Sequence, residues 1–384
     1  RRRLRAADRS RTGGADRPDQ RGGVEQQRPD PGQPLLERFR HTAHLGTAYA
    51  AEVTSVPVSE PSPPVLPAPA ALVLRGRRYD AARPAVMAII NRTRDSFWPG
   101  NRHADDDSAR AALDRAVELG ADIVDVGGVR AGQEGEWVDA AEEIRRVIPF
   151  LMYARETYPD LLISLDTWRA EVAAAAPDGV VDIVNDTWAG ADPELVHCAA
   201  ERGAAIVCSH SGGLPPRTDP IAITYGDDPL DVVRHVLRTL ADGAVRALAA
   251  GIPPERILVD PTLDFGKTTR HSLSVLRHTA DVTALGFPVL QALSRKDFIG
   301  ESLDLPADDR LEGTLAATAV AAWLGATVFR AHDVRATRRV IDMVAVIRGD
   351  RPPALSVRGV PTGAGTVLMQ MHMTTHGSLT REPL

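Results

Sequence analysis

The chain has 384 residues, which is long enough for one large domain with tails or for two domains. Its formal net charge of -6 argues against a general nucleic-acid binder, and no apolar run approaches the roughly 18–20 residues that cross a bilayer. The two cysteines, Cys198 and Cys208, form no CxxC pair, which suits a reduced cytoplasmic protein better than one held by disulfides.

The first part of the chain is not expected to belong to the fold. Residues 1 to about 75 are rich in Arg, Gly, Pro and Gln and show no hydrophobic period. Such a composition buries too little apolar surface to offset the entropy of ordering the chain. We therefore expect a disordered tail over residues 1–79, a folded region over residues 80–352 and an irregular C-terminal tail over residues 353–384.

From residue 85 onward, short apolar runs alternate with longer helical patterns. Helices are expected after the strands, among them residues 108–119, 140–158, 193–201 and 229–250. Strict alternation of strand and helix implies a parallel sheet, and eight such units indicate a single-domain α/β fold, the (β/α)8 or TIM barrel. The strands are expected at residues 86–90, 123–126, 161–165, 181–184, 205–208, 257–259, 288–290 and 327–329.

Polar side chains end or follow most of these strands. In parallel α/β folds, ligands bind at that end of the strands. Helix N-caps account for some of the Asp and Ser residues, but not for Lys296, Arg330 or His332. We therefore expect a binding site at this rim. For His210, a role in this site and a structural role in the fifth loop are equally favoured.

One group of rim residues suits a flat heterocycle. Its members are expected toward the middle of the barrel mouth, and they are Asp166, Asn185, Asp260 and Lys296. Fixed carboxylates, an amide and an ammonium match a ring with several N–H and C=O groups, because each polar group left unpaired costs roughly 1–3 kcal/mol.

A second group suits phosphate with Mg²⁺. Asn91, Arg330 and His332 belong to the first and eighth strands, which are neighbours in a closed barrel. A cation, an imidazole and an amide together can bind a phosphate and its metal ion. No pair of nucleophile and base stands out, so displacement of a phosphate-type leaving group is favoured over a covalent intermediate.

Several motifs together match a known family. They are Asn91-x-Thr93-x-Asp95-Ser96-Phe97, Asp125-Val126-Gly127-Gly128, Asp166-Thr167, Asn185-Asp186, Asp260-Pro261, Phe265-Gly266-Lys267, Ser294-Arg295-Lys296 and Arg330-x-His332-Asp333. With these motifs, the chain from about residue 84 to residue 352 resembles dihydropteroate synthases of the pterin-binding TIM-barrel superfamily. The resemblance implies the condensation of 6-hydroxymethyl-7,8-dihydropterin diphosphate with 4-aminobenzoate, which releases pyrophosphate, in folate biosynthesis.

The resemblance also implies a role for each matching residue. The residues implied to hold the pterin are Asp166, Asn185, Asp260 and Lys296. Pyrophosphate contacts are implied for Asn91, Arg330 and His332, with Mg²⁺ at Asn91. Contacts with 4-aminobenzoate are implied for Phe265 and Ser294. Catalysis is expected to involve Lys296, Asp166 and Arg330, and a homodimer is expected to form through barrel helices away from the loop rim.

Two loops depart from the usual family pattern. Arg94 stands where the first loop usually carries Pro, and residues 129–131 read Val-Arg-Ala where the second loop usually reads Glu-Ser-Thr-Arg-Pro. The usual residues help to order the lid over 4-aminobenzoate and pyrophosphate. The residues implied to hold the pterin are thus kept, whereas the two loops implied to cover the second substrate are changed. In this the chain resembles the divergent second paralogue of actinobacteria.

Three functions stay open at this point. The first is the synthase reaction, and the second is an impaired paralogue that binds pterin diphosphate without making dihydropteroate. The third is a pterin-dependent methyltransferase domain, against which the motifs at Phe265 and Ser294 argue.

Overall fold

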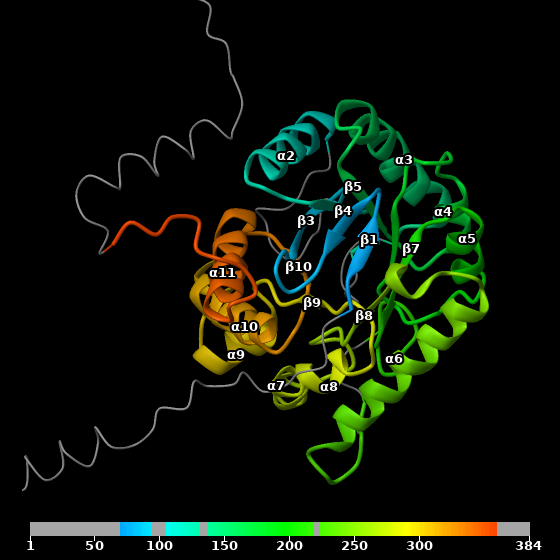
Figure 1. Cartoon of the computed structure of the whole chain (residues 1–384). Helices are drawn as coiled ribbons and strands as arrows, with labels where there is room; N and C mark the ends of the chain where they lie inside the picture. Colours follow the sequence, from blue (N-terminus) through cyan, green and yellow to red (C-terminus); the bar gives the residue numbers. More distant parts are fainter. Residues whose placement is uncertain (1–69, 94–104, 131–136, 219–222, 359–384) are drawn as a thin grey trace, which may run out of the picture. The chain divides into compact units, whose positions relative to one another are not determined.

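The computed structural model describes residues 70–93, 105–130, 137–218 and 223–358. Most of the two predicted tails, as well as Arg94 and Ala131, lies outside these residues. Within them, the predicted (β/α)8 barrel is confirmed, because parallel strands pair in the order β8-β7-β6-β5-β4-β3-β10-β9 (Figure 1). The two ends of this row meet at Val259 and Val289, where the Val259 N–H donates to the Pro288 carbonyl at 2.9 Å.

Strands and helices alternate along the described residues after a short hairpin. The hairpin and the first half of the barrel comprise β1 (Leu72–Leu74), β2 (Arg77–Tyr79), β3 (Ala85–Asn91), α2 (Asp106–Glu118), β4 (Ile123–Gly127), α3 (Ala140–Thr157), β5 (Leu162–Asp166), α4 (Ala170–Ala174), β6 (Ile183–Asp186) and α5 (Leu195–Glu201). The second half comprises β7 (Ala205–Ser209), α6 (Asp231–Ala249), η2 (Pro254–Arg256), β8 (Ile257–Asp260), α7 (Thr269–Arg277), α8 (Thr279–Thr283), β9 (Leu290–Ala292), α9 (Asp297–Leu303), η3 (Ala307–Asp309), α10 (Leu311–Trp323), β10 (Val328–Ala331) and α11 (Val334–Ile347).

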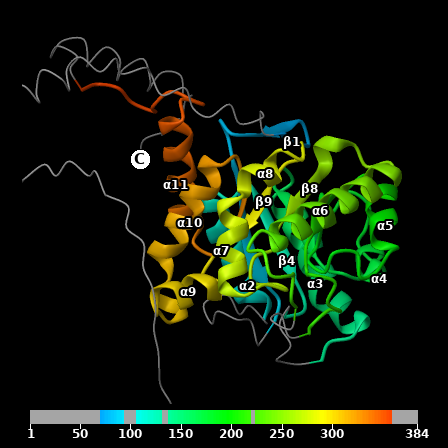
Figure 2. The same cartoon turned by 90° about the horizontal axis from the view of Figure 1, so that it is seen from below.

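Each barrel strand carries two rows of side chains, because successive residues of a strand point to opposite faces. On β3, Val86 and Ala88 pack in the apolar layer beneath the helices, whereas Ala85 and Met87 pack inside the barrel. Figures 1 and 2 show the helices arranged around the strands. The interior row also contains an apolar residue at or near the start of four strands that carry candidate site residues, namely Leu162, Ile183, Leu258 and Val328. Two or four positions further along the same rows stand Asp166, Asn185, Asp260 and Arg330.

The first two barrel helices begin at aspartate caps. The carboxylate of Asp105 accepts the Ser108 N–H of α2 at 2.8 Å, and the carboxylate of Asp139 accepts the Glu142 N–H of α3 at 2.8 Å. Such caps satisfy N–H groups that have no partner within the helix, and their negative charge suits the positive end of the helix dipole. These acids are therefore explained by helix formation and are not needed for a site.

The predicted start of the fold at residue 80 is too late. β1 and β2 form an antiparallel hairpin in which Leu72 faces Tyr79. Leu72, Leu74 and Tyr79 are buried against the first interior residues of the barrel strands, and Figure 2 shows β1 at one end of the barrel. Two strands of three residues give no readable period, so the hairpin could not be distinguished from the proline-rich stretch before it.

Two strand positions also differ from the prediction. β6 begins two residues after the predicted position 181, and β9 begins at Leu290, where the predicted strand ends. Pro288 has no N–H to donate to a ladder, which delays the start of β9. The connections after β8 and β9 each hold two α-helices instead of one.

None of the helices in the described part of the chain is both long and apolar enough to cross a membrane.

A buried carboxylate, Asp182, ties the hairpin to the barrel. It accepts hydrogen bonds from Arg75 Nε at 2.5 Å, from Arg155 Nη2 at 2.5 Å and from the Ile163 N–H at 2.8 Å. Its side chain is 8% exposed. One carboxylate therefore joins the hairpin, α3 and β5, and it balances the charges of Arg75 and Arg155.

We expect Asp182→Ala to lower the free energy of unfolding by about 3 kcal/mol, because it leaves two guanidinium groups and an N–H without their partner. Urea unfolding at neutral pH measures the loss. The matched control is Asp178→Ala, since Asp178 pairs with Arg202 at 3.2 Å but is 98% exposed. The control should show no measurable loss, and equal losses in the two variants would contradict the assignment.

Candidate functional site

Asp125 and Arg330 lie at the centre of a polar site inside the barrel. Asp125 on β4 is fully buried, and it accepts from Ser164 Oγ at 2.5 Å and from Arg330 Nε at 2.6 Å. Asn185 Nδ2 donates to the same carboxylate at 3.2 Å. Arg330 on β10 also donates through Nη2 to Asp166 at 2.7 Å. Side chains from β4, β5, β6 and β10 are therefore joined in one network.

Two carboxylates share the single guanidinium of this network. Burial raises the pKa of Asp166 to about 7, with Arg330 opposing the rise and Asp125 adding to it. The second oxygen of Asp166 accepts from Thr187 Oγ1 at 2.8 Å. Burial lowers the pKa of Arg330, but the two carboxylates outweigh it and raise the pKa above its ordinary value. Arg330 is therefore always charged, and Asp166 is the group of this network that titrates near neutral pH.

Asp260 and Lys296 belong to a second group of polar side chains at the barrel mouth. Asp260 ends β8, is 6% exposed and accepts the Thr262 N–H at 2.7 Å. Burial raises its pKa, and the charge of Lys296 opposes the rise. Lys296 Nζ donates to the Leu263 carbonyl and lies 5.1 Å from the ring centroid of Phe265. Burial lowers the pKa of Lys296. The loop after β8 thus brings an aromatic ring next to a half-buried ammonium.

The predicted aminobenzoate residues lie beside other aromatic and polar groups. The ring of Phe265 packs edge-on against Trp188, with 5.6 Å between ring centroids and 77° between ring planes. Ser294 Oγ accepts the His332 N–H at 3.2 Å and lies 3.0 Å from His332 Nδ1. Burial lowers the pKa of His332 to about 3, so its ring is neutral at physiological pH. His332 therefore offers a neutral hydrogen-bonding group and not a second cation.

Asn91 ends β3 and lies opposite Gly127 of β4 in the strand register. A Cβ added at Gly127 would lie 3.5 Å from Asp166 Oδ2 and 3.6 Å from Asn91 Oδ1. Two oxygen atoms therefore border the space that the missing side chain leaves. In the described residues, no group of three or more His, Cys, Asp or Glu side chains gathers in a way that could hold a metal ion.

The structure brings most of the predicted site residues together in small groups. Asn185 and Arg330 both donate to Asp125, and Arg330 also donates to Asp166, whose oxygen borders the same space as that of Asn91. Lys296 lies beside Phe265, which is on the loop after Asp260, and Ser294 pairs with His332. Arg330, which we predicted at the pyrophosphate, donates inward to two carboxylates. Its role toward a ligand stays a prediction.

Sequence reasoning missed two residues of the site, Asp125 and Thr187. Asp125 was noted as part of a motif but was given no role. A signal for it was present, because Asp125 interrupts the apolar run Ile123–Gly127 at an interior position of the strand. A carboxylate at such a position needs a partner in the core. Thr187 follows a strand like many other loop residues, so nothing in its pattern marks it.

The raised pKa of Asp166 predicts a pH dependence of stability. A carboxyl whose pKa is higher in the folded chain stabilises the fold when protonated. That contribution is complete below about pH 4 and is lost as the pH rises toward 7. Relative to the parent, Asp166→Asn should therefore become more stable by about 2 kcal/mol between pH 5 and pH 8. Urea unfolding at both pH values measures this, and a pH-independent difference would rule the assignment out.

Comparisons with known proteins identify the family to which the chain belongs. The profile of a family described as pterin binding enzyme matches residues 87–332. Over 288 residues, 75% of this chain and 99% of the relative, the sequence is 52% identical to a Mycobacterium leprae (strain TN) protein named inactive dihydropteroate synthase 2. Over 273 residues, 71% of this chain and 95% of the relative, it is 33% identical to the dihydropteroate synthase of Escherichia coli (strain K12).

A solved structure shows the same likeness in three dimensions. It is a dihydropteroate synthase from Coxiella burnetii in complex with pteroic acid, and it matches with a TM-score of 0.65 at 30% identity. The match covers 73% of this chain and 99% of that one. The chain therefore belongs to the dihydropteroate synthase family of pterin-binding enzymes, which are transferases of folate biosynthesis.

Proposed function

We propose that the chain binds a pterin diphosphate at the barrel mouth and performs its family's condensation with 4-aminobenzoate slowly. The observation that carries this proposal is the buried set of fixed donors and acceptors around Asp125 and Asp260. Polar groups buried at the carboxyl ends of barrel strands are a feature of ligand sites, because the core alone does not need them.

The pterin ring carries N–H donors and N or C=O acceptors along its edges. We assign Asp166 and Asp260 as acceptors for ring N–H groups, Lys296 as a donor to a ring acceptor, and Asn185 to the ring edge. A carboxylate has about four positions at which it can accept, so Asp166 can bind the ring while it keeps its present partners. The Coxiella relative was solved with pteroic acid, in which a pterin is joined to 4-aminobenzoate.

The condensation needs little covalent chemistry from the protein. The amine nitrogen of 4-aminobenzoate attacks the methylene carbon of the pterin, the carbon–oxygen bond to the diphosphate breaks, and the diphosphate leaves with the electron pair. The new secondary amine then gives up a proton to water. We assign Phe265 and Ser294 to 4-aminobenzoate, and Arg330 and His332 to the diphosphate. Holding the two substrates in line is the main task, and such positioning is worth roughly 7–11 kcal/mol.

The residues also fit a Mg²⁺ ion that arrives with the diphosphate. Mg²⁺ prefers oxygen ligands and keeps most of its coordination shell as water and substrate phosphate. The Asn91 amide oxygen and an Asp166 oxygen border the same space above Gly127, which suits one or two protein ligands. When bound, the ion would offset the negative charge of the diphosphate.

Slow turnover is inferred from the two loops that form the lid. Such loops exclude water and complete the site when they close. Val129 and Ala131 cannot supply the hydroxyl and proline contacts that the family's second loop usually provides, although Arg130 is retained. The Mycobacterium leprae relative is named inactive. A protein that binds pterin diphosphate and makes no dihydropteroate is therefore the second candidate function.

We expect Asp260→Ala to weaken pterin diphosphate binding by about 2 kcal/mol, or roughly thirtyfold, because a ring N–H loses its charged acceptor. Isothermal titration calorimetry with pterin diphosphate measures the change. Asp178→Ala removes an exposed carboxylate elsewhere and serves as the control. Unchanged affinity of the Asp260 variant would refute its role in the pterin site.

Replacing residues 129–131 by Glu-Ser-Thr-Arg-Pro, together with Arg94→Pro, should raise synthase turnover at least about tenfold, a gain of about 1.4 kcal/mol in the barrier. The control is the same graft with Ala-Ala in place of Ser-Thr, which keeps the loop length. Turnover is measured as dihydropteroate formed from both substrates. A graft that leaves turnover unchanged would show that the lid is not what limits the reaction.

We also propose a homodimer through α10 and α11. Four apolar side chains on these packed helices are exposed, namely Val320, Trp323, Met343 and Ile347. Arg348, just after α11, donates to the Trp323 carbonyl, which places the ends of the two helices side by side. Light scattering at micromolar concentration should give twice the monomer mass, and Met343→Glu with Ile347→Glu should give a monomer. A monomeric parent would remove this proposal.

The free thiols of Cys198 and Cys208 support a reduced, cytoplasmic location.

A further inference from the structure

The chain contains two lysines and 43 arginines, and both lysines lie beside one loop of the site. Lys296 is the pterin residue proposed above. Lys267 lies between β8 and α7, is 2% exposed and has no role so far. An ammonium is a compact charge with three rotatable donors, whereas a guanidinium is a planar fork. A lysine at position 267, in a chain that otherwise uses arginine, thus indicates several hydrogen-bond acceptors arranged around one nitrogen atom.

Lys267 Nζ has such partners. It donates to the carbonyls of Phe265 at 2.9 Å, of His210 at 3.0 Å and of Thr262 at 3.1 Å. His210 Nδ1 lies 2.7 Å from the same nitrogen, and His210 Nε2 lies 2.8 Å from His235 Nδ1. Lys267 therefore ties two carbonyls of the loop after β8 to the backbone that follows β7, and His210 is a structural histidine of this connection.

The loop after β8 has a backbone that needs such support. Thr262, Asp264 and Gly266 have φ angles of 48°, 71° and 60°. Positive φ is rare for a β-branched residue such as threonine, and it persists where the surroundings impose it. A Cβ added at Gly266 would lie 2.5 Å from the Ser211 carbonyl oxygen, so the loop is pressed against the segment after β7. Two of the carbonyls that Lys267 binds, those of Thr262 and Phe265, belong to this strained stretch.

The same loop holds Lys296 in place. Its Leu263 carbonyl accepts from Lys296 Nζ, and its Phe265 ring lies beside that nitrogen. The Asp264 carboxylate accepts the Asp297 N–H at 2.7 Å, directly after Lys296 in the chain. A shift of the loop would therefore move the proposed pterin donor.

We propose that Lys267 is a positioning residue, which fixes the strained loop of residues 262–266 against the segment after β7 and thereby sets the place of Lys296 in the site. The effect on pterin affinity rests on the proposed function, whereas the effect on the loop does not.

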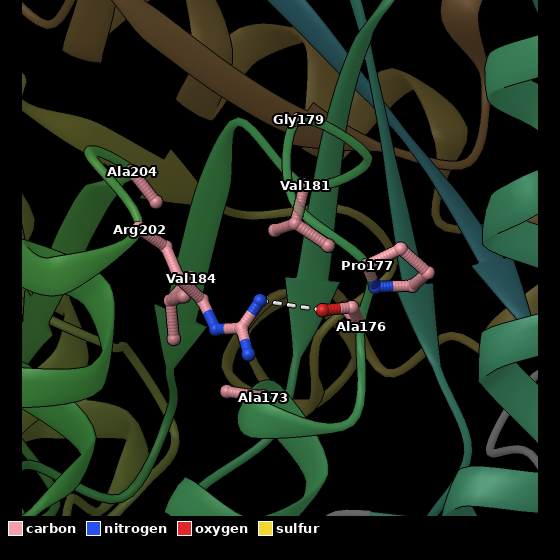
Figure 3. Close-up of a pocket in the computed structure, with 8 residues that line it drawn as sticks. All are labelled: Ala173, Ala176, Pro177, Gly179, Val181, Val184, Arg202 and Ala204. Atoms are coloured by element: carbon pink, nitrogen blue, oxygen red, sulfur yellow. Dashed lines mark hydrogen bonds between the residues drawn. The ribbon is translucent and has the colours of Figure 1, made fainter.

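Three variants test the proposal. Lys267→Met keeps the length of the side chain and removes its donors, and Lys267→Gln keeps two N–H donors. The matched control is Arg202→Met. Arg202 donates to the carbonyls of Ala174 and Ala176 beside a cavity of about 10 Å³, which has room for one water molecule (Figure 3). It lies near α4 and α5, away from the loop after β8.

Amide hydrogen exchange of residues 262–268, measured without ligand, is the first readout. We expect Lys267→Met to raise exchange there at least about tenfold with exchange in β4 unchanged, Lys267→Gln to be intermediate, and Arg202→Met to match the parent. Calorimetry is the second readout, and pterin diphosphate should bind at least about tenfold more weakly to Lys267→Met. Parent-like exchange of the loop in a folded Lys267 variant would overturn the proposal.

Two further outcomes separate the proposals. A parent chain that binds no pterin diphosphate would refute the proposed function, while the exchange readout would still decide the role of Lys267. If neither Lys267 variant folds, ¹⁵N-lysine labelling of the parent decides it, because two lysines give two Nζ signals. One signal should show Nζ protons that exchange at least about tenfold more slowly than those of free lysine. Two signals that both exchange as in free lysine would overturn the proposal.

Discussion

Asp125 is fully buried inside the barrel, and the guanidinium of Arg330 balances its charge there at 2.6 Å. Moving either ion out of water costs several kcal/mol, so neither residue is stable at its position without the other. Ser164 and Asn185 supply the remaining hydrogen bonds of the carboxylate. The pair therefore decides how the ends of four strands are arranged. Asn185 and Asp166, two of the proposed pterin residues, are hydrogen-bonded to this pair.

Burial is the main cause of the raised pKa of Asp166, which reaches about 7. The charge of Arg330 opposes the rise, and the nearby charge of Asp125 adds to it. Two carboxylates share one guanidinium here, because Arg330 donates to Asp125 and to Asp166. Under the proposed function, a ligand that donates N–H groups to Asp166 would stabilise the ionised carboxylate without bringing a full positive charge.

The barrel was predictable because it follows from a simple period, and the same reading placed the candidate site residues at the ends of strands, where their roles stay predictions. Alternation of strand and helix gave the fold, and the polar ends of strands gave Asp166, Asn185, Asp260 and Lys296. Asp125 escaped because one charge within an apolar strand reveals its partner only in three dimensions. The inward direction of Arg330 escaped for the same reason, since two carboxylates from other strands compete with any ligand for its guanidinium. For the lid loops the sequence predicts less. Their changed residues predict that contacts are lost, but they do not predict which loop conformation is adopted instead.

The proposed function combines retained pterin residues with an altered lid, so the most direct test compares binding with turnover in the unmodified chain. Calorimetry with pterin diphosphate and a dihydropteroate assay with both substrates should be run beside the Escherichia coli synthase under the same conditions. The account predicts comparable pterin diphosphate affinity for the two proteins, with turnover of this chain slower by at least about tenfold. Turnover as fast as that of the Escherichia coli enzyme, or no binding of pterin diphosphate, would contradict it.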